Sequence, residues 1–203
     1  MKLLIFTRYP RPGRVKTRLI PVLGAEGAQR LHRQMTEHTL ECLQCFAQVQ
    51  ICFEGGGRKL MQAWLGERLT YIPQGQGDLG RRLRRAISRA FRQGEDKVIV
   101  VGTDCPGLTA SHVKEALQLL HQSDLVLGPA ADGGYYLIGL NSFYKDLFKD
   151  IAWGTDRVFR QTLQKADRLG LKTLFLEKLA DVDRPERHFC LDFIERRCFV
   201  SLS

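Results

Sequence analysis

The sequence predicts an α/β fold with a mainly parallel sheet, and two observations support this. Short apolar runs that suit buried strands alternate along the chain with longer segments in which apolar residues recur at helical spacing. Strands that alternate with helices are joined by crossover connections, which favour parallel pairing. The chain has 203 residues, of which 44% are hydrophobic and 26% charged, so we expect a single domain over residues 1–203.

The strands are predicted from short runs of apolar and β-branched residues. The segment KVIVVGTD at 97–104 is the clearest, because it places four β-branched residues in succession. The run KLLIFT at 2–7 is a short apolar segment of the same kind. The other predicted strands cover 48–54, 69–73, 124–130, 133–140 and 171–177.

Helices are predicted between and after these strands. The segment at 78–92 spaces its apolar residues so that they make one face. Thr109 and Thr155 are expected to cap two further helices, which end near residues 121 and 169. The remaining helices are predicted at 24–45, 58–65 and 185–197.

Charge and cysteine content narrow the environment and the partners. The formal net charge of +9 indicates an anionic partner. The first apolar run is too short for a signal peptide, and no apolar run approaches the length of about 18 residues that a membrane span needs, so we expect a cytoplasmic protein. The six cysteines are then expected to be structural or incidental, including the isolated C-x-x-C of Cys42 and Cys45.

The segment RYPRPGRVKTRL at 8–19 follows the first predicted strand. Ligands of parallel α/β sheets bind at the carboxyl ends of strands, so this basic loop suits a polyphosphate. Gly13 lets the backbone approach a ligand closely, although a solvated basic loop is the alternative. The loop contributes five cationic side chains, Arg8, Arg11, Arg14, Lys16 and Arg18.

Several aspartates also lie at predicted strand ends. Asp104 ends the most apolar strand, where a carboxylate needs a partner, and a hard divalent cation is a suitable one. Asp132, Asp181 and Asp183 are candidates for a second ligand, because they follow other strands. Turn or helix-cap roles are open for these aspartates as well.

The glycine-rich segment QGQGDLGRRL at 74–83 joins a predicted strand to a helix. Neither a P-loop nor a dinucleotide-binding fingerprint is present in the sequence. The arginines of the helix at 78–92 are expected to form a solvated face, and nucleic-acid binding is disfavoured because few aromatic residues are interleaved with them.

Six motifs in this order resemble those of a bacterial family of uncharacterised nucleotide-diphospho-sugar transferase-like proteins, the DUF2064 group. They are PRPGRVKTRL, GQGDLGRRL, GTDCPGLT, GPAADGGYYLIGL, IAWGTDRV and DVDRPE, and the resemblance spans roughly residues 3 to 190. The chain is more distantly similar to 2-phospho-lactate guanylyltransferases and molybdopterin-cofactor nucleotidyltransferases. The resemblance implies a three-layer α/β/α sandwich with a Rossmann-like sheet that binds a nucleotide at its carboxyl edge.

The resemblance also implies roles for particular residues. Asp104 and Asp183 would hold Mg²⁺ or Mn²⁺, and the catalytic residues would be Arg14, Lys16 and Asp104. The implied nucleotide-binding residues are Arg8, Gly13, Arg14, Lys16, Arg18, Gly77, Asp78 and Arg82. The implied acceptor-binding residues are Asp132, Gly133, Gly134 and Tyr135.

Two departures from related patterns bear on the reaction. Glycosyltransferases of this fold carry D-x-D, whereas this chain has the single aspartate of TDCP. Nucleotidyltransferases carry a glycine-rich first loop, whereas prolines replace most of those glycines here, with Gly13 and Lys16 retained.

The predicted function is metal-dependent nucleotidyl transfer from a nucleoside triphosphate to a phosphorylated small molecule. The alternative is glycosyl transfer from a nucleotide-sugar, and a third hypothesis is a non-enzymatic nucleotide-binding or nucleic-acid-binding protein. The third is disfavoured because strand-end carboxylates repel phosphate unless a metal intervenes. We expect no membrane partner.

Overall fold

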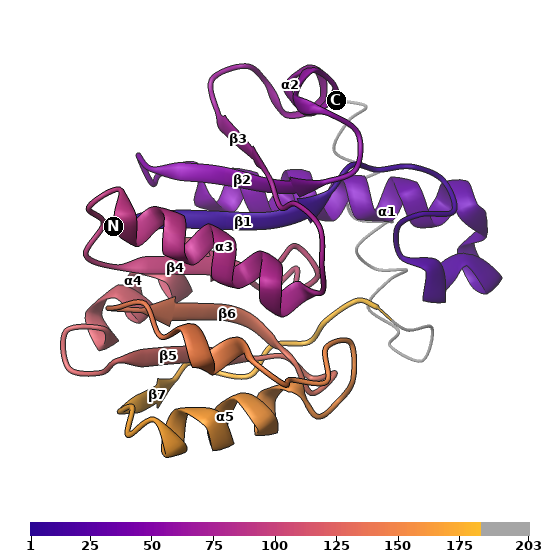
Figure 1. Ribbon diagram of the computed structural model, residues 1–203. Helices are drawn as coiled ribbons and strands as arrows, with labels where there is room; N and C mark the ends of the chain where they lie inside the picture. Colours follow the sequence, from indigo (N-terminus) through magenta and orange to yellow (C-terminus); the bar gives the residue numbers. More distant parts are fainter. Residues whose placement is uncertain (184–203) are drawn as a thin grey trace.

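The computed structural model describes residues 1–183, so the helix predicted at 185–197 lies outside the described residues. Within 1–183 the strands form one sheet in the order β3-β2-β1-β4-β6-β5-β7 (Figure 1). The strands are β1 (Lys2–Arg8), β2 (Val49–Glu54), β3 (Thr70–Pro73), β4 (Val98–Val101), β5 (Leu125–Pro129), β6 (Tyr135–Leu140) and β7 (Thr173–Phe175). None of the helices in this part of the chain is long and apolar enough to cross a membrane.

The sheet is mainly parallel, as the sequence predicts. β1 lies between β2 and β4 and pairs in parallel with both, and β2 pairs in parallel with β3. β6 is the exception, because it runs antiparallel to β4 and to β5. The short 130–134 connection makes β5 and β6 a hairpin, and β7 then returns parallel to β5.

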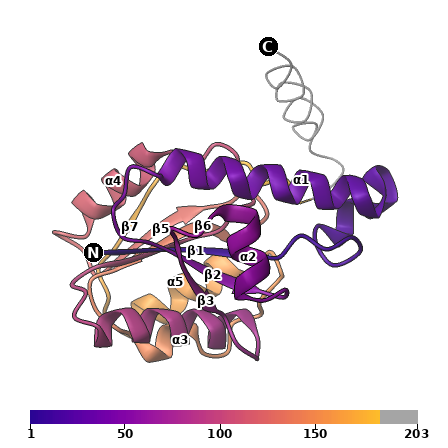
Figure 2. The ribbon, with the colours of Figure 1, turned by 90° about the horizontal axis from the view of Figure 1, so that it is seen from above.

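Helices cover both faces of the sheet, which gives the three-layer sandwich (Figure 2). On one face α1 and α4 pack with β1 through a cluster that includes Leu3, Leu43 and Val113. On the other face α3 and α5 pack with β1 through a cluster that includes Leu4 and Ile87. The helices are α1 (Ile20–Leu43), α2 (Arg58–Leu65), α3 (Leu79–Arg92), α4 (Ala110–Leu119) and α5 (Val158–Arg168), with 3₁₀ turns η1 (Thr17–Leu19) and η2 (Lys145–Phe148).

The side chains of successive residues in a buried strand pack on opposite faces of the sheet. Leu3 and Ile5 belong to the first cluster and Leu4 to the second, as the period of two in a strand requires. All four residues of β4 are buried, which explains its unbroken β-branched sequence.

Helix starts differ from the sequence prediction in two places. The helix predicted from residue 24 begins at Ile20, and Gly24 forms a kink inside it with φ 68° and ψ 168°. Thr109 caps α4 as predicted, and its backbone N–H donates to His112 Nδ1 at 3.1 Å. The prediction that Thr155 caps α5 is wrong: Arg157 is the N-cap, because Thr155 forms a turn in which its hydroxyl donates to the Ala152 carbonyl at 2.7 Å.

Candidate nucleotide-binding site

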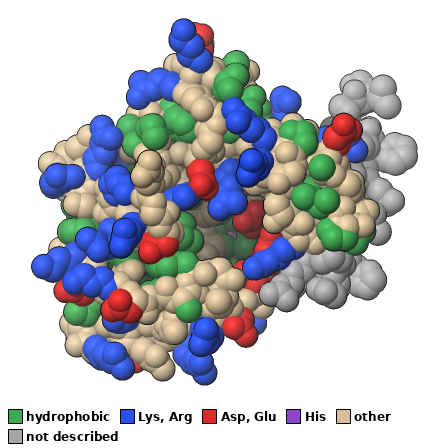
Figure 3. Space-filling view, turned by 45° about the vertical axis from the view of Figure 1, so that its right-hand side comes forward, with side chains coloured by type: hydrophobic (Ala, Val, Ile, Leu, Met, Phe, Trp, Pro, Cys, Tyr) green, Lys and Arg blue, Asp and Glu red, His purple; other side chains and the backbone are tan. Residues whose placement is uncertain are grey.

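A cavity of about 690 Å³ opens at the carboxyl ends of the central strands. The space-filling view in Figure 3 shows acidic and basic side chains gathered around a hollow in this face. Loops that are far apart in the sequence meet here, because parallel strands bring their carboxyl ends to the same edge. The charged residues that line the cavity are Arg8, Lys16, Arg18, Glu54, Asp78, Arg82, Asp104, Asp132, Asp181 and Asp183.

Lys16 and Asp104 form an ion pair in this cavity. The distance from Lys16 Nζ to Asp104 Oδ1 is 2.6 Å, and the Lys16 side chain is only 2% exposed, whereas that of Asp104 is 55% exposed. Lys16 Nζ also donates to the backbone carbonyl of Val182. Desolvation raises the pKa of Asp104, but the charge and hydrogen bond of Lys16, together with the charges of His32 and Arg8, lower it below its ordinary value, so the carboxyl is ionised at neutral pH.

The backbone of Lys16 is left-handed, with φ 47° and ψ 40°. Non-glycine residues in this region carry strain, and such strain concentrates at functional sites. The strained turn directs Lys16 toward the end of β4 and so joins the first loop to Asp104.

The sequence suggested a divalent cation as the partner of Asp104, and in this structure the carboxylate pairs with Lys16. The expectation assumed that the carboxylate is buried like the strand before it, but the strand ends at Val101, and Asp104 lies in the loop beyond it. Its carboxylate is exposed, and Asp104 lines the cavity.

Glu54 holds two cavity arginines together. Its Oε2 atom lies 2.8 Å from Arg8 Nε and 2.6 Å from Arg82 Nη1. The parallel register pairs Arg8 with Glu54 at the ends of β1 and β2, and Arg82 reaches them from α3. The hydrogen bond from Arg82 lowers the pKa of Glu54; desolvation opposes this shift, and the charge of Arg8 adds to it.

Two further buried residues hold the end of β1 in place. Gln74 Nε2 donates to the carbonyls of Thr7 at 3.1 Å and Cys52 at 2.9 Å, so it joins β1 and β2. His32 on α1 hydrogen-bonds the Arg8 carbonyl at 2.9 Å through Nε2, and burial lowers its pKa. Both side chains line the cavity.

Glu54, Gln74 and His32 were not predicted from the sequence. Glu54 and Gln74 each lie at or directly after a strand end, which is the signal that singled out Asp104. His32 lies within a long helix, and its sequence neighbourhood gives no comparable signal.

Arg18 binds Asp183 across the mouth of the site. Arg18 Nη1 lies 2.7 Å from Asp183 Oδ2, and Nη2 donates to the Gly154 carbonyl at 3.3 Å. The segment before Asp183 is anchored to the β4 loop, because Val182 N–H donates to the Asp104 carbonyl at 2.8 Å. The two predicted metal ligands are therefore carried by adjoining segments.

The carboxylates of Asp104 and Asp183 suit a hard cation only in combination with substrate. Within residues 1–183 no group of three or more His, Cys, Asp or Glu side chains is arranged to hold a metal ion. Mg²⁺ is commonly held by one or two carboxylates together with substrate phosphates and water. Asp104 and Asp183 both line the cavity, and in this structure they pair with Lys16 and Arg18 respectively.

The predicted nucleotide-binding turn before α3 has a structural role as well. Asp78 is the N-cap of α3, and its Oδ1 atom accepts from Arg81 N–H at 2.8 Å. The Gly77 carbonyl accepts from Arg82 Nε at 2.8 Å, and Gly77 has φ 104°. The turn thus places Arg82 beside Glu54, and Gly77, Asp78 and Arg82 all line the cavity.

The predicted acceptor-binding segment 132–135 forms a tight turn against the start of α5. Asp132 Oδ1 accepts from Gly134 N–H at 2.8 Å, and both residues line the cavity. Gly133 has φ 90° and packs against the Asp156 backbone. Tyr135 lines the cavity too, as expected of an acceptor-binding residue, but its hydroxyl is buried, and burial raises its pKa.

Three predicted binding residues lie outside the lining of this cavity as described for residues 1–183. Gly13 and Arg14 are exposed in the first loop, and Gly133 lies within the acceptor turn, against the Asp156 backbone. Arg11 lies over the ring of Tyr9, 5.9 Å from its centroid.

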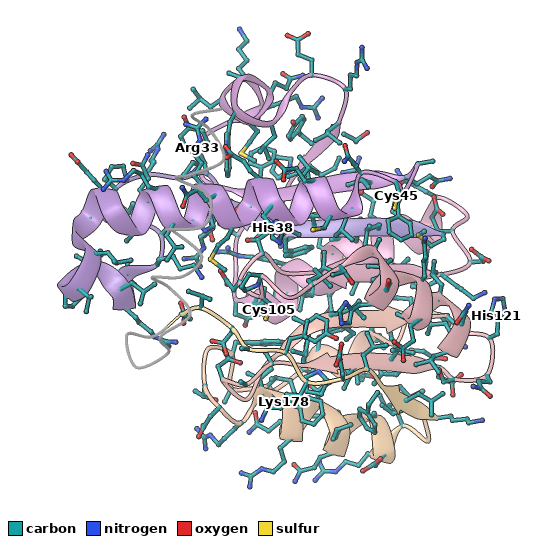
Figure 4. The ribbon with its side chains drawn as sticks, turned by 180° about the vertical axis from the view of Figure 1, so that it is seen from behind. Arg33, His38, Cys45, Cys105, His121 and Lys178 are labelled. Atoms are coloured by element: carbon teal, nitrogen blue, oxygen red, sulfur yellow. The ribbon has the colours of Figure 1, made fainter. Side chains whose placement is uncertain are left out.

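The C-x-x-C pair lies at the carboxyl end of α1, away from this cavity. Figure 4 shows Cys45 at that end, and His38 on the side of α1 that faces the loop containing Cys105. His38 Nε2 hydrogen-bonds the Pro106 carbonyl at 3.0 Å, which ties α1 to the loop after β4.

The chain is similar in sequence and in fold to known nucleotidyltransferases. The 2-phospho-L-lactate guanylyltransferase of Methanocaldococcus jannaschii is 32% identical over 108 residues, which are 51% of this chain and 46% of that protein. The chain thus spans about half the length of the curated relatives it matches. A nucleotidyl transferase from Methanothermobacter, 14% identical, shares the fold with a TM-score of 0.63 over 96% of this chain and 99% of that chain.

Two matches define the family. The crystal structure of a candidate nucleotide-diphospho-sugar transferase from Desulfovibrio desulfuricans G20 is 34% identical, covers 97% of this chain and 95% of that chain, and superposes with a TM-score of 0.87. The family described as "Uncharacterized protein conserved in bacteria (DUF2064)" matches residues 39–155, more than half of the chain. The protein therefore belongs to the DUF2064 family.

Proposed function

We propose that this protein is a nucleotidyltransferase that transfers a nucleoside monophosphate from a nucleoside triphosphate to a phosphorylated small molecule. The observation that carries the proposal is the Lys16–Asp104 pair, which joins the basic first loop to the end of β4 inside the cavity. A cation for phosphate and a carboxylate for a phosphate-bound metal ion then lie side by side. The names of the curated relatives support the same class of reaction.

The basic residues of the cavity would bind and orient the triphosphate. Arg8 uses Nε for Glu54 while its side chain stays 59% exposed, so its outer N–H groups can reach phosphate oxygens. Lys16 and Arg18 approach from the same loop, and Arg82 from α3. Phosphoryl and nucleotidyl transfer depend chiefly on positioning and charge neutralisation, which such a set provides.

The reaction requires one bond to form and one to break at the α-phosphorus. An oxygen of the acceptor phosphate attacks in line, the bond from the α-phosphorus to the α,β-bridging oxygen breaks, and pyrophosphate leaves with the electron pair. Lys16 already contacts Asp104 and the Val182 carbonyl, so it would donate its remaining N–H to a departing phosphate oxygen. Asp104 and Asp183 would hold Mg²⁺ or Mn²⁺, which as a Lewis acid lowers the charge on the phosphate oxygens.

Glycosyl transfer from a nucleotide-sugar is the second candidate. It is favoured by the likeness to the Desulfovibrio protein, which extends over nearly the whole of both chains. The same cations would then stabilise a departing nucleoside diphosphate. The segment after β4, TDCP, has a single aspartate where glycosyltransferases of this fold carry D-x-D, and this difference places the reaction second.

Thermal-shift titrations distinguish the two reactions. The protein is tested with the four nucleoside triphosphates and with UDP-glucose, GDP-mannose and ADP-glucose, each with and without Mg²⁺ or Mn²⁺. Metal-dependent stabilisation by a triphosphate, followed by pyrophosphate release with a phosphorylated acceptor, is the expected result. Stabilisation by nucleotide-sugars alone would support glycosyl transfer, and no stabilisation by any nucleotide would contradict both reactions.

A further inference from the structure

Trp153 is one of the aromatic residues that line the cavity, together with Phe6, Tyr135 and Tyr136. It lies in the AWGT segment at 152–155, to which the proposed function gives no role. Two other segments pack around it, the GDLG turn at 77–80 and the GGYY turn at 133–136. The position of its indole ring is therefore fixed by three separate parts of the chain.

Gly80 allows the indole ring to approach α3 closely. A Cβ atom at Gly80 would lie 2.5 Å from Trp153 Nε1 and 2.7 Å from the Phe148 carbonyl oxygen. Glycine is less favourable than alanine inside a helix, so a helical glycine at such a contact points to a requirement for close approach. The pyrrole edge of the indole thus rests on the first turn of α3.

Tyr135 supports the indole ring from β6. The two ring centroids are 6.5 Å apart, and the planes meet edge to face at 82°. The Tyr135 hydroxyl is buried, so this tyrosine contributes its ring to packing rather than its hydroxyl to a ligand. Leu79, which is 42% exposed, lines the same cavity and adds to its apolar surface.

Two aspartates lie close in sequence to the residues of this apolar surface. Asp78 directly precedes Leu79, and Asp132 lies in the turn before Tyr135; both line the cavity. Carboxylates accept hydrogen bonds from hydroxyl groups and repel phosphates. An apolar ring face bordered by such acceptors matches a hydroxylated ring better than it matches a phosphate chain.

We propose that Trp153 and Leu79 form a subsite that binds the sugar ring of a substrate or product, with its C–H face against the indole. The subsite rests on the proposed function, because the sugar would reach it attached to the phosphate that occupies the basic side of the cavity. For nucleotidyl transfer this makes the acceptor a cyclic sugar phosphate rather than a short linear phosphorylated acid. The nucleotide-sugar, as product or donor, would occupy the same subsite.

Intrinsic fluorescence tests the subsite directly, because the chain has two tryptophans. Trp64, on α2, hydrogen-bonds Glu37 at 2.7 Å and does not line this cavity as described, so Trp64→Phe leaves Trp153 as the sole indole fluorophore. Each nucleoside diphosphate is compared with its own sugar conjugate, UDP with UDP-glucose, GDP with GDP-mannose and ADP with ADP-glucose, in the presence of Mg²⁺. We expect the conjugate of the preferred base to change Trp153 emission more than its diphosphate does.

Substitutions at Trp153 and Gly80 test whether the indole ring binds the sugar or only packs in the wall of the cavity. Trp153→Phe keeps an apolar ring in the wall and Trp153→Ala removes it; both should weaken the conjugate, the alanine variant by about tenfold, and leave the diphosphate affinity unchanged. Gly80→Ala should act in the same direction, because its methyl group displaces the indole without altering any charge.

The outcomes are distinguishable. Equal loss of affinity for diphosphate and conjugate in Trp153→Ala would assign the indole to the nucleobase and overturn the sugar subsite. Unchanged affinity for both would overturn it as well, because the indole would then be structural. Failure of every nucleotide to bind the parent protein would instead contradict the proposed function and the subsite together.

Discussion

The Lys16–Asp104 pair is asymmetric, because its cation is buried and its carboxylate is exposed. Without the Asp104 carboxylate, the buried Lys16 ammonium loses its negatively charged partner. Without the ammonium, water can still solvate the exposed carboxylate. Asp104→Asn should therefore lower the free energy of unfolding by about 2 kcal/mol, and Lys16→Met by less than about 1 kcal/mol. Urea denaturation at pH 7 measures both, and a larger loss for Lys16→Met would contradict this description of the pair.

Glu54 makes the arginine cluster sensitive to acid. Its pKa is lowered in the folded protein, so its ionised form contributes stability above the unfolded-state pKa, near 4.5, and this contribution is lost as pH falls through the folded-state pKa. Glu54→Gln should therefore cost stability at pH 7 and much less at pH 3. Urea denaturation of both proteins at the two pH values tests this, and an equal difference at both would show that Glu54 does not act through its charge.

At the scale of elements, the acceptor turn is docked on the start of α5 through Gly133. A Cβ atom there would lie 2.3 Å from the Asp156 carbonyl oxygen, and Phe159 N–H donates to the Gly133 carbonyl at 2.9 Å. Gly133→Ala should lower the free energy of unfolding by about 3 kcal/mol and reduce the proposed transferase activity, because the turn must move.

Gly94 provides a matched control for Gly133. It has a similar φ of 88°, but a Cβ atom there would meet nothing within 4 Å. Gly94→Ala should therefore cost only the backbone strain, about 1 to 2 kcal/mol, and leave activity unchanged. Thermal unfolding and initial rates of both variants give the comparison, and equal losses would show that contact with Asp156 does not matter.

Strands were easier to predict from the sequence than helix starts. β4 was clear because burial on both faces demands apolar residues throughout. The start of α1 was missed because Gly24 interrupts its helical pattern with a kink. The start of α5 was placed too early because Thr155 forms a turn rather than a cap. The antiparallel direction of β6 depends on the short turn before it, which its own sequence does not reveal.

The site was predicted in part. Lys16 and Asp104 could be identified because charges at strand ends are visible in the sequence, but their direct pairing depends on the strained turn at Lys16. Glu54 was missed because its role follows from the register that sets it beside Arg8 and from the approach of Arg82.

The whole molecule is organised around one sheet that mixes early and late parts of the chain. β1 pairs with both β2 and β4, and β4 pairs in turn with β6. The described strands therefore form one continuous sheet rather than two separate ones. We predict that residues 1–203 unfold as one domain, with coincident transitions by near- and far-ultraviolet circular dichroism. Two separated midpoints would contradict a single domain.

The proposed function requires that the first loop bind the phosphates of a nucleotide and that Asp104 hold the metal ion bound to those phosphates. Calorimetric titration of the best-stabilising nucleoside triphosphate with Mg²⁺ tests it, using the parent protein, Lys16→Met and Arg92→Met. The two variants remove one positive charge each, but Arg92 lies at the end of α3 and outside the lining described for the cavity. We expect Lys16→Met to weaken binding by about tenfold or more and Arg92→Met to bind like the parent. Equal affinity of the parent and Lys16→Met would contradict a phosphate-binding role for the first loop.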